Sequence, residues 1–394
     1  MSFFHTRVWQ VMISTFFYWL GINLVWLFLN FHLEALGLSR TFVGLANATP
    51  AIAIVVLGIP VGILIPRAGY VKNLIAGGWL AGLGLLLVAW APNSGAVLVG
   101  LLAFGVGQVF VIGTAAPLMT ALVDRRQQVL ALSWQSAFGM VAGFIGNAAG
   151  GYLAEQLSGP RGVIYAAAGM FFLSTIPLLD LAVEKEWKAR KFRLKNRQIW
   201  QKLLSLHLLI ALGAGLIMPF LNLYLAEKFS LSFEEVGLLF ALSSLATAAA
   251  MLLEPNLVKR LGKVGAIVFS QLLALPFIVV LAYVPNLPLV TAALFLRTAL
   301  INGAYPVYVA LAMELLSPEE RSAFMLGVQS VWNIGWAVSS TISGQVQAVF
   351  GFQAFGFLFL GMLFCYSLST FLYPRFFRLK HPEVNYEGNS HPSA

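Results

Sequence analysis

The sequence predicts an all-α polytopic membrane protein, with twelve transmembrane helices arranged as two pseudo-symmetric six-helix bundles. The first observation is composition: 59% of the 394 residues are hydrophobic and 10% are charged, whereas soluble domains carry about 25% charged residues. The second is a series of apolar runs, each long enough to cross the ~30 Å hydrocarbon core of a bilayer. The third is an internal duplication, in which motifs of the first half return about 193 positions later.

Apolar runs of roughly 20 or more residues define the predicted helices. They lie at residues 9–32, 41–65, 72–91, 95–123, 128–156, 162–183, 200–226, 234–258, 264–284, 288–315, 322–349 and 352–373. Several are longer than a perpendicular crossing needs, which predicts tilted helices or ends that project beyond the lipid. The first run is too long for a cleavable signal peptide and lacks a small-residue cleavage site, so we expect it to remain as the first helix.

The duplication is visible in short motifs. AWAPN at 89–93 returns as AYVPN at 282–286, and VGL at 43–45 returns as VGL at 236–238. One residue out of step, FLNFHL at 28–33 returns as FLNLYL, so Asn30 corresponds to Asn222. Internal repeats in an apolar chain are typical of secondary transporters.

The repeats and a charged stretch predict the domain boundaries. We expect two helical bundles at 1–183 and 200–374, a basic linker at 184–199, and a tail at 375–394. The linker also carries aromatic residues among its cations, which predicts a short helix on anionic lipid headgroups.

The net charge of +9 is a topology signal. Lysines and arginines concentrate in the linker, the termini and the even-numbered loops, whereas the odd-numbered loops hold only Arg40, Arg161 and Lys228. The positive-inside rule therefore places both termini in the cytoplasm, and nucleic acid is not an expected partner.

The sequence lacks the common motifs of catalytic and metal sites. Cys365 is the only cysteine, and there is no zinc-ligand spacing, P-loop, HExxH pair or apparent nucleophile–base pair. We therefore expect no enzymatic activity, no metal and no cofactor. No ATP-binding domain is present either, so any transport would draw on a gradient.

The turn between the second and third helices resembles a known signature. GILIPRAGYVK at 62–72 is similar to the Gly-x-Leu-Ala-Asp-Arg-x-Gly-Arg-Lys motif of the major facilitator superfamily, although Pro66 replaces the acidic residue. NLVKRLGKV at 256–264 repeats it. The resemblance implies a monomeric transporter that works by alternating access.

In that family the basic residues of the turn pair with carboxylates at nearby helix ends and close the cytoplasmic side. The resemblance therefore implies two cytoplasmic latches that flank glycine turns. The expected members are Arg67, Gly69 and Asp124 in the first half, and Arg260, Gly262 and Glu314 in the second. The alternative is that each charge snorkels independently to the interface.

The fifth helix resembles a second signature, which is associated with exporters. AGFIGNAAGG at 142–151 keeps Gly146, Gly150 and Gly151 of Gly-x3-Gly-Pro-x2-Gly-Gly but has Asn147 in place of proline. This pattern is closest to bacterial drug-efflux members. The alternative is that the glycine stripe is only a packing face.

Arg297 is the strongest candidate for a functional side chain. It lies about nine residues into its predicted helix, or roughly 13 Å along the axis, where the first half has Gln108. An intramembrane charge normally faces a cavity, a substrate or a counter-charge. The functional interpretation is a partner for an anionic or polar substrate group. The alternative is a fixed ion pair, for example with Glu34, or a bond to backbone carbonyls.

Other polar and aromatic residues gather on the helices that line the central cavity in this family. Together with Arg297 and Gln108, the expected substrate-binding set is Asn23, Trp26, Asn30, Asn222, Asn302, Tyr305, Gln329 and Trp332. Each could instead be an interfacial anchor or helix-packing residue. For proton coupling we expect Glu34 and His32, with Glu254 and His207 as the other titratable candidates.

Together these observations predict a secondary transporter in a bacterial plasma (inner) membrane. The expected activity is proton-coupled efflux of an amphiphilic or drug-like small molecule. One alternative is uptake or exchange of a small organic anion held by Arg297. Another is a non-transporting receptor or lipid-modifying protein on the same scaffold.

Overall fold

The computed structural model describes residues 6–123, 128–157, 159–181, 196–316 and 318–377. All the regular elements within these ranges are helical. Eleven segments of the described chain are long and apolar enough to cross a membrane, and the last of them, Phe324–Phe376, contains two successive helices. The fold is therefore all-α, with twelve crossings.

The first six crossings are single helices joined by short turns. They are α1 (Thr6–Ala35), α2 (Arg40–Ala68), α3 (Tyr70–Trp90), α4 (Ser94–Ala121), α5 (Gln128–Gln156) and α6 (Pro160–Thr175), the last extended by a 3-10 turn at Ile176–Leu178. Asn93 caps α4, because its side chain accepts a hydrogen bond from the Ala96 amide.

Two of the six crossings in the second half are interrupted, and two others are joined in one bent helix. The helices are α7 (Arg197–Ile217), α8 (Leu221–Phe229), α9 (Phe233–Tyr283), α10 (Leu287–Gly303), α11 (Tyr305–Leu315), α12 (Pro318–Phe350) and α13 (Ala354–Phe376). The breaks between α7 and α8 and between α10 and α11 each contain a proline. Proline has no backbone N–H to donate, so it interrupts the helical hydrogen bonds there. Within α9, Gly262 has a φ of 70° and divides the helix into two limbs, each of which crosses the membrane.

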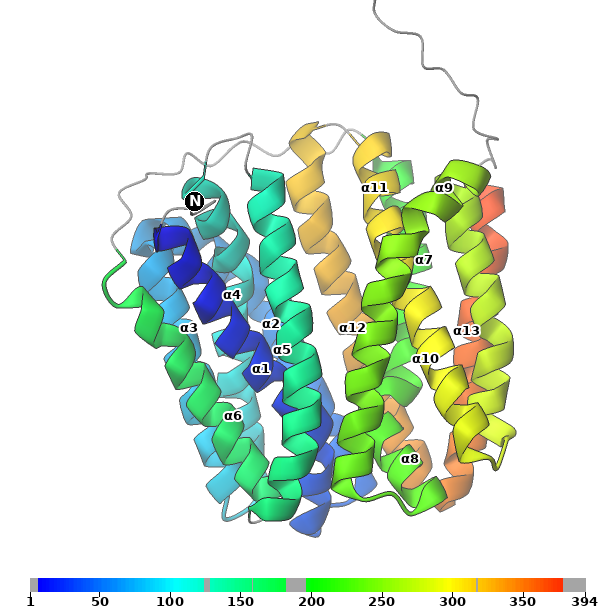
Figure 1. The fold of residues 1–394 in the computed structure, drawn as a ribbon, viewed down its shortest axis with the longest axis horizontal. Coiled ribbons are helices and arrows are strands. Elements are labelled where there is room, and N and C mark those ends of the chain that lie inside the picture. The colour runs from blue at the N-terminus through cyan, green and yellow to red at the C-terminus, as the bar shows by residue number, and fades with distance from the viewer. Residues whose placement is uncertain (1–5, 124–127, 158, 182–195, 317, 378–394) are drawn as a thin grey trace, which may run out of the picture.

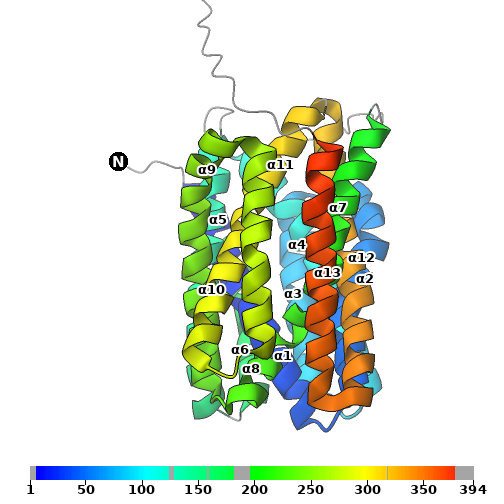
Figure 2. The ribbon, with the colours of Figure 1, turned by 90° about the vertical axis from the view of Figure 1, so that its right-hand side faces the viewer.

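The two halves lie side by side, with α1–α6 on the left of Figure 1 and α7–α13 on the right. We call the face at which α1 begins and α13 ends the terminus face; it is at the top of Figures 1 and 2. The opposite face, at which α1 ends and α2 begins, is the far face. Across the middle of the molecule, α2 packs against α12, and α5 packs against α9.

Backbone geometry repeats at the same offset as the sequence motifs. Gly69, with a φ of 90°, corresponds to Gly262, and Gly37, with a φ of 74°, corresponds to Ser230, with a φ of 53°. Asn286 caps α10 through the Leu289 amide, as Asn93 caps α4. The repeated motifs therefore encode repeated turns.

Two glycine pairs bring the halves into backbone contact near the far face. A Cβ on Gly44 of α2 would lie 2.5 Å from the Ser340 oxygen of α12, and a Cβ on Gly344 would lie 2.5 Å from the Arg40 oxygen. On the other edge, Gly151 of α5 and Gly237 of α9 face each other in the same way. Only glycine permits such close helix approach.

The structure describes only the last residues of the predicted linker at 184–199. Residues 182–195 and 378–394 lie outside the described ranges, so most of the predicted linker and tail does too. The helix α7 begins at Arg197, which lies within the predicted linker 184–199.

Candidate functional site

A cavity of about 740 Å³ lies between the two halves. Its walls come mainly from α1, α4, α5, α9, α10 and α12. The lining residues of α1 run from Ser14 to Asn23, and those of α5 from Gln135 to Asn147. Because both helices start at the terminus face, the cavity occupies the centre and the terminus side of the molecule.

The cavity lining combines apolar side chains with polar, uncharged groups. Aromatic rings come from Tyr18, Trp19 and Phe240. Hydroxyl and amide groups come from Thr15, Asn23, Gln135, Asn147, Ser243, Thr298, Asn302 and Gln329, among others. No Asp, Glu, Lys, Arg or His lines it among the residues that the structure describes. Such a lining offers hydrogen bonds and aromatic surface to a ligand, without a counter-charge.

Packing between α1 and α5 shapes one wall. Gly139 lies beneath the Trp19 ring, where an added Cβ would be 3.2 Å from Cδ1. Gly143 and Gly146 lie in the same way against Asn23. The Asn23 side chain donates to the Trp19 carbonyl at 2.8 Å, which fixes its orientation. Close packing therefore accounts for the glycines of α5, as the alternative interpretation of the exporter-like signature expected.

Three residues of the expected substrate-binding set line the cavity, namely Asn23, Asn302 and Gln329. Three others, Trp26, Tyr305 and Trp332, lie outside its lining and belong to a row of rings. In this row Trp26 contacts Trp336 at 5.3 Å, Trp336 contacts Trp332 at 6.0 Å, and Trp332 contacts His207 at 5.5 Å between centroids. Tyr305 joins the row through His207 at 6.1 Å. Because Trp26 is on α1 and Trp336 on α12, the row connects the two halves.

Arg297 does not line the cavity in this conformation. It is 2% exposed, and its Nη2 donates to the Tyr366 hydroxyl at 2.5 Å while Nη1 points to the Met218 sulfur at 3.1 Å. Its guanidinium also lies over the Tyr366 ring, 5.4 Å from the centroid. The next residue, Thr298, does line the cavity. One residue turns a helix by about 100°, so Arg297 points into its own bundle instead.

The alternative interpretation, an ion pair between Arg297 and Glu34, does not match the contacts of Glu34. Glu34 pairs with Arg40, at 2.5 Å between Oε1 and Nε. In the first half, Gln108 is also buried outside the cavity lining, and its Nε2 has no hydrogen-bond partner among the described residues.

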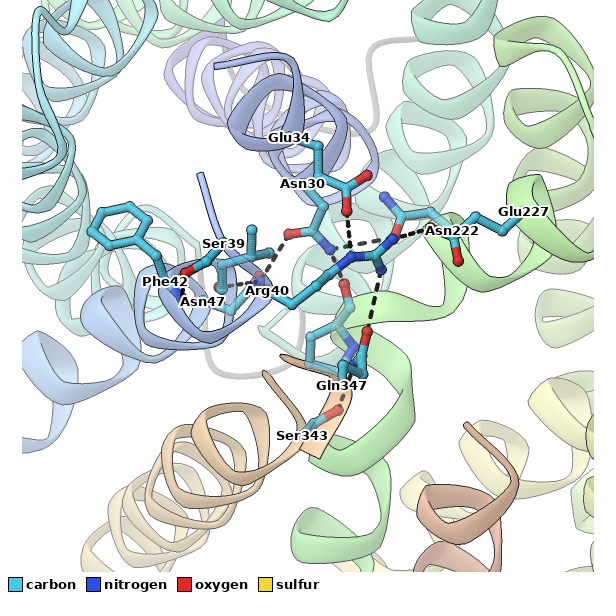
Figure 3. A network of polar contacts seen from close by, with 12 residues as sticks. Asn30, Glu34, Ser39, Arg40, Phe42, Asn47, Asn222, Glu227, Ser343 and Gln347 are labelled. Atoms are coloured by element: carbon cyan, nitrogen blue, oxygen red, sulfur yellow. Dashed lines mark hydrogen bonds and ion pairs between the residues drawn. The ribbon is translucent and has the colours of Figure 1, made fainter. Parts of the chain in front are cut away.

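The far face is closed by a polar cluster that we call the Arg40 clamp: Arg40 with Glu34, Glu227 and Gln347. Arg40 begins α2 and forms ion pairs with Glu34 of α1 and Glu227 of α8. It also donates to the Gln347 oxygen of α12 at 3.2 Å. Figure 3 shows its guanidinium between these partners. Because two of the three partners belong to the second half, the clamp ties the halves together.

Buried asparagines form a second layer beneath the clamp (Figure 3). Asn30 donates to the Pro219 carbonyl and, at 3.3 Å, to the Asn222 oxygen. Asn222 donates to the Leu27 carbonyl at 2.5 Å, and Asn47 donates to the Asn30 oxygen at 2.8 Å. Asn30 and Asn222, both expected to bind substrate, are at most 3% exposed and do not line the cavity. They form a contact between the two halves instead.

The two expected proton-coupling residues lie in fixed contacts near the far face. Glu34 belongs to the Arg40 clamp. His32 is buried, and its Nε2 lies 3.2 Å from the Val88 carbonyl. Proton coupling through either residue stays a prediction.

At the terminus face the second expected latch has a different cation. Glu314 pairs with Lys263 rather than with Arg260. Lys263 directly follows Gly262, whose positive φ turns the chain there, whereas Arg260 lies before that turn and lines a separate small cavity. For the first latch, Gly69 has the expected positive φ. Asp124 and the Arg67 side chain lie outside the described part of the structure.

Sequence reasoning missed the central residue of the clamp. Arg40 was visible as one of three cations in odd-numbered loops, against the positive-inside pattern. That exception was the available signal. Glu227 and Gln347 carried no comparable signal, because Arg40 lies far from them in the sequence. Asn47, whose partner Asn30 is on the preceding helix, carried none either.

Two six-helix halves around a central cavity that is closed at the far face are the architecture typical of secondary transporters. A profile of the Major Facilitator Superfamily matches residues 11–206 and 203–391. The chain therefore belongs to the Major Facilitator Superfamily, a family of transporters rather than enzymes.

Comparison with individual proteins gives more distant matches. The chain is 26% identical over 143 residues to a niacin transporter of Acinetobacter baylyi, covering 36% of this chain and 32% of that protein. It is 29% identical over 141 residues to a putative niacin/nicotinamide transporter of Bacillus subtilis, covering 35% and 34%. The matches thus span about a third of these relatives. The fold is similar to a nucleoside transporter NupG mutant, with a TM-score of 0.80 at 14% identity and coverage of 94% and 100%.

Proposed function

We propose that this protein is a secondary transporter that moves an uncharged, amphiphilic small molecule with hydrogen-bonding groups across the membrane. The cavity lining carries the proposal, because amide, hydroxyl and aromatic groups meet there without a charged side chain among the described residues. A charged solute entering such a cavity would lose hydration without gaining a counter-charge. An uncharged solute loses less, and it gains hydrogen bonds and aromatic contact.

The proposed orientation places the terminus face in the cytoplasm of a bacterium whose inner membrane holds the protein. It rests on the concentration of cations in the linker, termini and even-numbered loops. With that orientation, the Arg40 clamp and the glycine pairs shut the cavity from the outside. The structure would then be the cytoplasm-facing member of an alternating-access pair.

The names of the curated relatives suggest a sharp choice of substrate. Niacin and nicotinamide are pyridines that differ in one group, a carboxylate in niacin and a carboxamide in nicotinamide. The uncharged lining favours the carboxamide. The alternative of an organic anion held by Arg297 has less support, because Arg297 is bound to Tyr366 and Met218 outside the cavity lining.

The expectation of efflux rests on an aromatic, sparsely charged pocket together with the exporter-like glycines of α5. Since these glycines have packing partners, they no longer argue for a direction. The proposal therefore concerns the chemistry of the cargo, and its experiment measures flux both ways.

The test is flux in proteoliposomes with labelled nicotinamide, niacin, uridine and a neutral amphiphilic dye. We expect exchange of one or more neutral compounds and little exchange of niacin. Asn302→Ala and Gln329→Ala should lower the rate, whereas Arg161→Ala, on the exposed start of α6, should not. Preferential transport of niacin would overturn the assignment of cargo. Absence of flux for the whole panel would favour a non-transporting role.

A further inference from the structure

A buried carboxyl group lies in the second half of the molecule, away from the central cavity. Glu254 is on the first limb of α9 and is 6% exposed. Ser270, on the second limb, donates a hydrogen bond to its Oε1 at 3.0 Å. The other oxygen, Oε2, is buried and has no hydrogen-bond partner among the described residues.

This carboxyl group faces its own cavity, of about 320 Å³. The two limbs of α9 meet at Gly262, near the terminus face, and Glu254 and Ser270 each lie eight residues from that turn. At 1.5 Å per residue, the carboxyl is therefore about 12 Å from the turn. Asn256, Arg260 and Leu300 also line this cavity, so it is bounded by both α9 and α10.

The charged groups around Glu254 are few. Arg260 is the only other charged side chain in the described lining of this cavity. From α10 the nearby residues are Leu300 and Gly303, while Arg297 is turned towards Tyr366. Lys263 is occupied by Glu314 of α11. Within the described structure, no cation is therefore paired with Glu254.

An ionised carboxylate in this position would be costly. A buried carboxylate needs a paired cation or several donated hydrogen bonds, and Glu254 receives one. A neutral carboxylic acid carries no charge and leaves fewer lone pairs in need of a donor, so its burial costs less. The geometry therefore favours the protonated form in this conformation.

We propose that Glu254 is a proton-binding site of the second half, reached through the cavity that Arg260 lines. In the conformation described here, the proton is bound to Oε2 and the side chain is neutral. Release breaks that O–H bond and passes the proton to solvent at the terminus face. The carboxylate left behind is then stabilised by the Arg260 guanidinium. The conformation described here binds the proton more tightly than a conformation in which ionised Glu254 pairs with Arg260. Proton binding therefore favours the conformation described here.

This inference rests on the proposed function only for its link to transport, where it replaces Glu34 and His32 as the coupling residue. Proton binding itself can be measured without any substrate. The two parts are therefore tested separately.

The first test is infrared difference spectroscopy of the purified protein between acidic and alkaline buffer. A protonated buried carboxylic acid gives a carbonyl band that ionised groups lack. We expect Glu254→Gln to remove a band that Glu314→Gln, which alters an exposed carboxyl, leaves unchanged. Ser270→Ala should shift the same band, because it removes the hydrogen bond to Oε1, and it serves if the first variant folds poorly. A spectrum that neither Glu254→Gln nor Ser270→Ala changes would overturn the proposal.

The second test follows the conformation. Spin labels at Leu36→Cys and Val349→Cys, both exposed at the far face and on different halves, report its opening in a Cys365→Ser background. We expect alkaline buffer to open the far face in the parent protein, and Glu254→Gln to abolish this pH dependence and keep it closed. Nicotinamide counterflow without a proton gradient should persist in Glu254→Gln, while proton-driven accumulation is lost. Counterflow absent from the parent would contradict the proposed cargo alone. Unaltered pH dependence in Glu254→Gln would contradict the proton site alone.

Discussion

Asn30 and Asn222 occupy equivalent positions in the two repeats, and each donates to the carbonyl three residues before the other. Asn30 bonds the Pro219 carbonyl, Asn222 bonds the Leu27 carbonyl, and the two side chains meet at 3.3 Å. A sequence equivalence has become a physical contact. The two halves are therefore joined, at the closed end of the cavity, by a reciprocal pair.

Removing either asparagine should weaken this closed end to a similar extent. Asn30→Ala or Asn222→Ala leaves a buried carbonyl without its donor, a loss of about 1–3 kcal/mol. The double variant should cost less than the sum of the singles, because the two residues share one contact. Thermal unfolding in detergent measures all three, and strictly additive losses would contradict the pairing.

Arg40→Gln should open the far face. The substitution removes the cation shared by Glu34 and Glu227, so the two carboxylates face each other without compensation. Spin-label distances between α1 and α12 at the far face should lengthen, more so in alkaline than in acidic buffer. Arg161→Gln is the matched control, because the Arg161 side chain bonds to Tyr165 on its own helix. An effect of equal size in both variants would argue against the clamp.

Gly44→Val should prevent closure of the far face. Its side chain would overlap the α12 backbone at Ser340 and Gly344, which cannot give way as a flexible side chain would. We expect the population to shift towards the conformation open at the far face, with slower exchange of any substrate. Gly169→Val on α6, where nothing lies within 4 Å of the added Cβ, should leave both unchanged. A closed far face in Gly44→Val would contradict the role of the glycine contact.

Ser230→Gly should stabilise the protein. Ser230 has a φ of 53°, a left-handed conformation that costs a non-glycine residue about 1 kcal/mol, and the first repeat has Gly37 there. The thermal midpoint should rise, and Gly37→Ser should lower it by a comparable amount. If Ser230→Gly lowered the midpoint, the strain at this turn would not be the controlling factor.

Arg297→Gln should affect stability more than substrate choice. It breaks the bond to the Tyr366 hydroxyl inside the second bundle, a loss of about 2 kcal/mol. The thermal midpoint should fall while the ratio of nicotinamide to niacin transport is unchanged. Thr298→Val, at the neighbouring position that lines the cavity, should change the ratio of nicotinamide to niacin transport and leave the thermal midpoint unchanged. Selective loss of niacin transport in Arg297→Gln would restore the anion hypothesis.

Helix positions were predictable because lipid imposes a length and a composition on each crossing. The predicted run at 41–65 became α2 at Arg40–Ala68, and Gly262 appeared where two predicted helices meet. Glycine turns at Gly69 and Gly262 were predictable too, since a short reversal of the chain calls for positive φ.

The rotation of each helix was harder to predict. Arg297 and Thr298 are neighbours in sequence, yet only Thr298 lines the cavity. An apolar helix surrounded by lipid and other helices lacks the polar stripe that would fix its rotation. Depth in the membrane was therefore a poor guide to cavity exposure at Arg297.

Contacts between distant helices were outside the reach of the sequence. The partners of Arg40 in the second half lie 187 and 307 residues away, on α8 and α12. The repeat showed which residues are equivalent but not which ones touch. Asn30 and Asn222 are equivalent in the repeats and also in contact. Gln108 and Arg297 are equivalent too, but they remain apart in separate bundles.

The glycine pairs carry a consequence for the origin of this architecture. Gly44 and Gly237 are one repeat position, and Gly151 and Gly344 are the other, each separated by 193 residues. The contact of α2 with α12 and that of α9 with α5 are therefore two copies of a single interface. A protein made of one six-helix repeat would already possess both of its surfaces. Two such subunits related by a twofold axis would close through the same glycines, as an isologous homodimer. In that sense this chain is a dimer whose subunits have been fused, and later divergence has given the two halves different polar interiors.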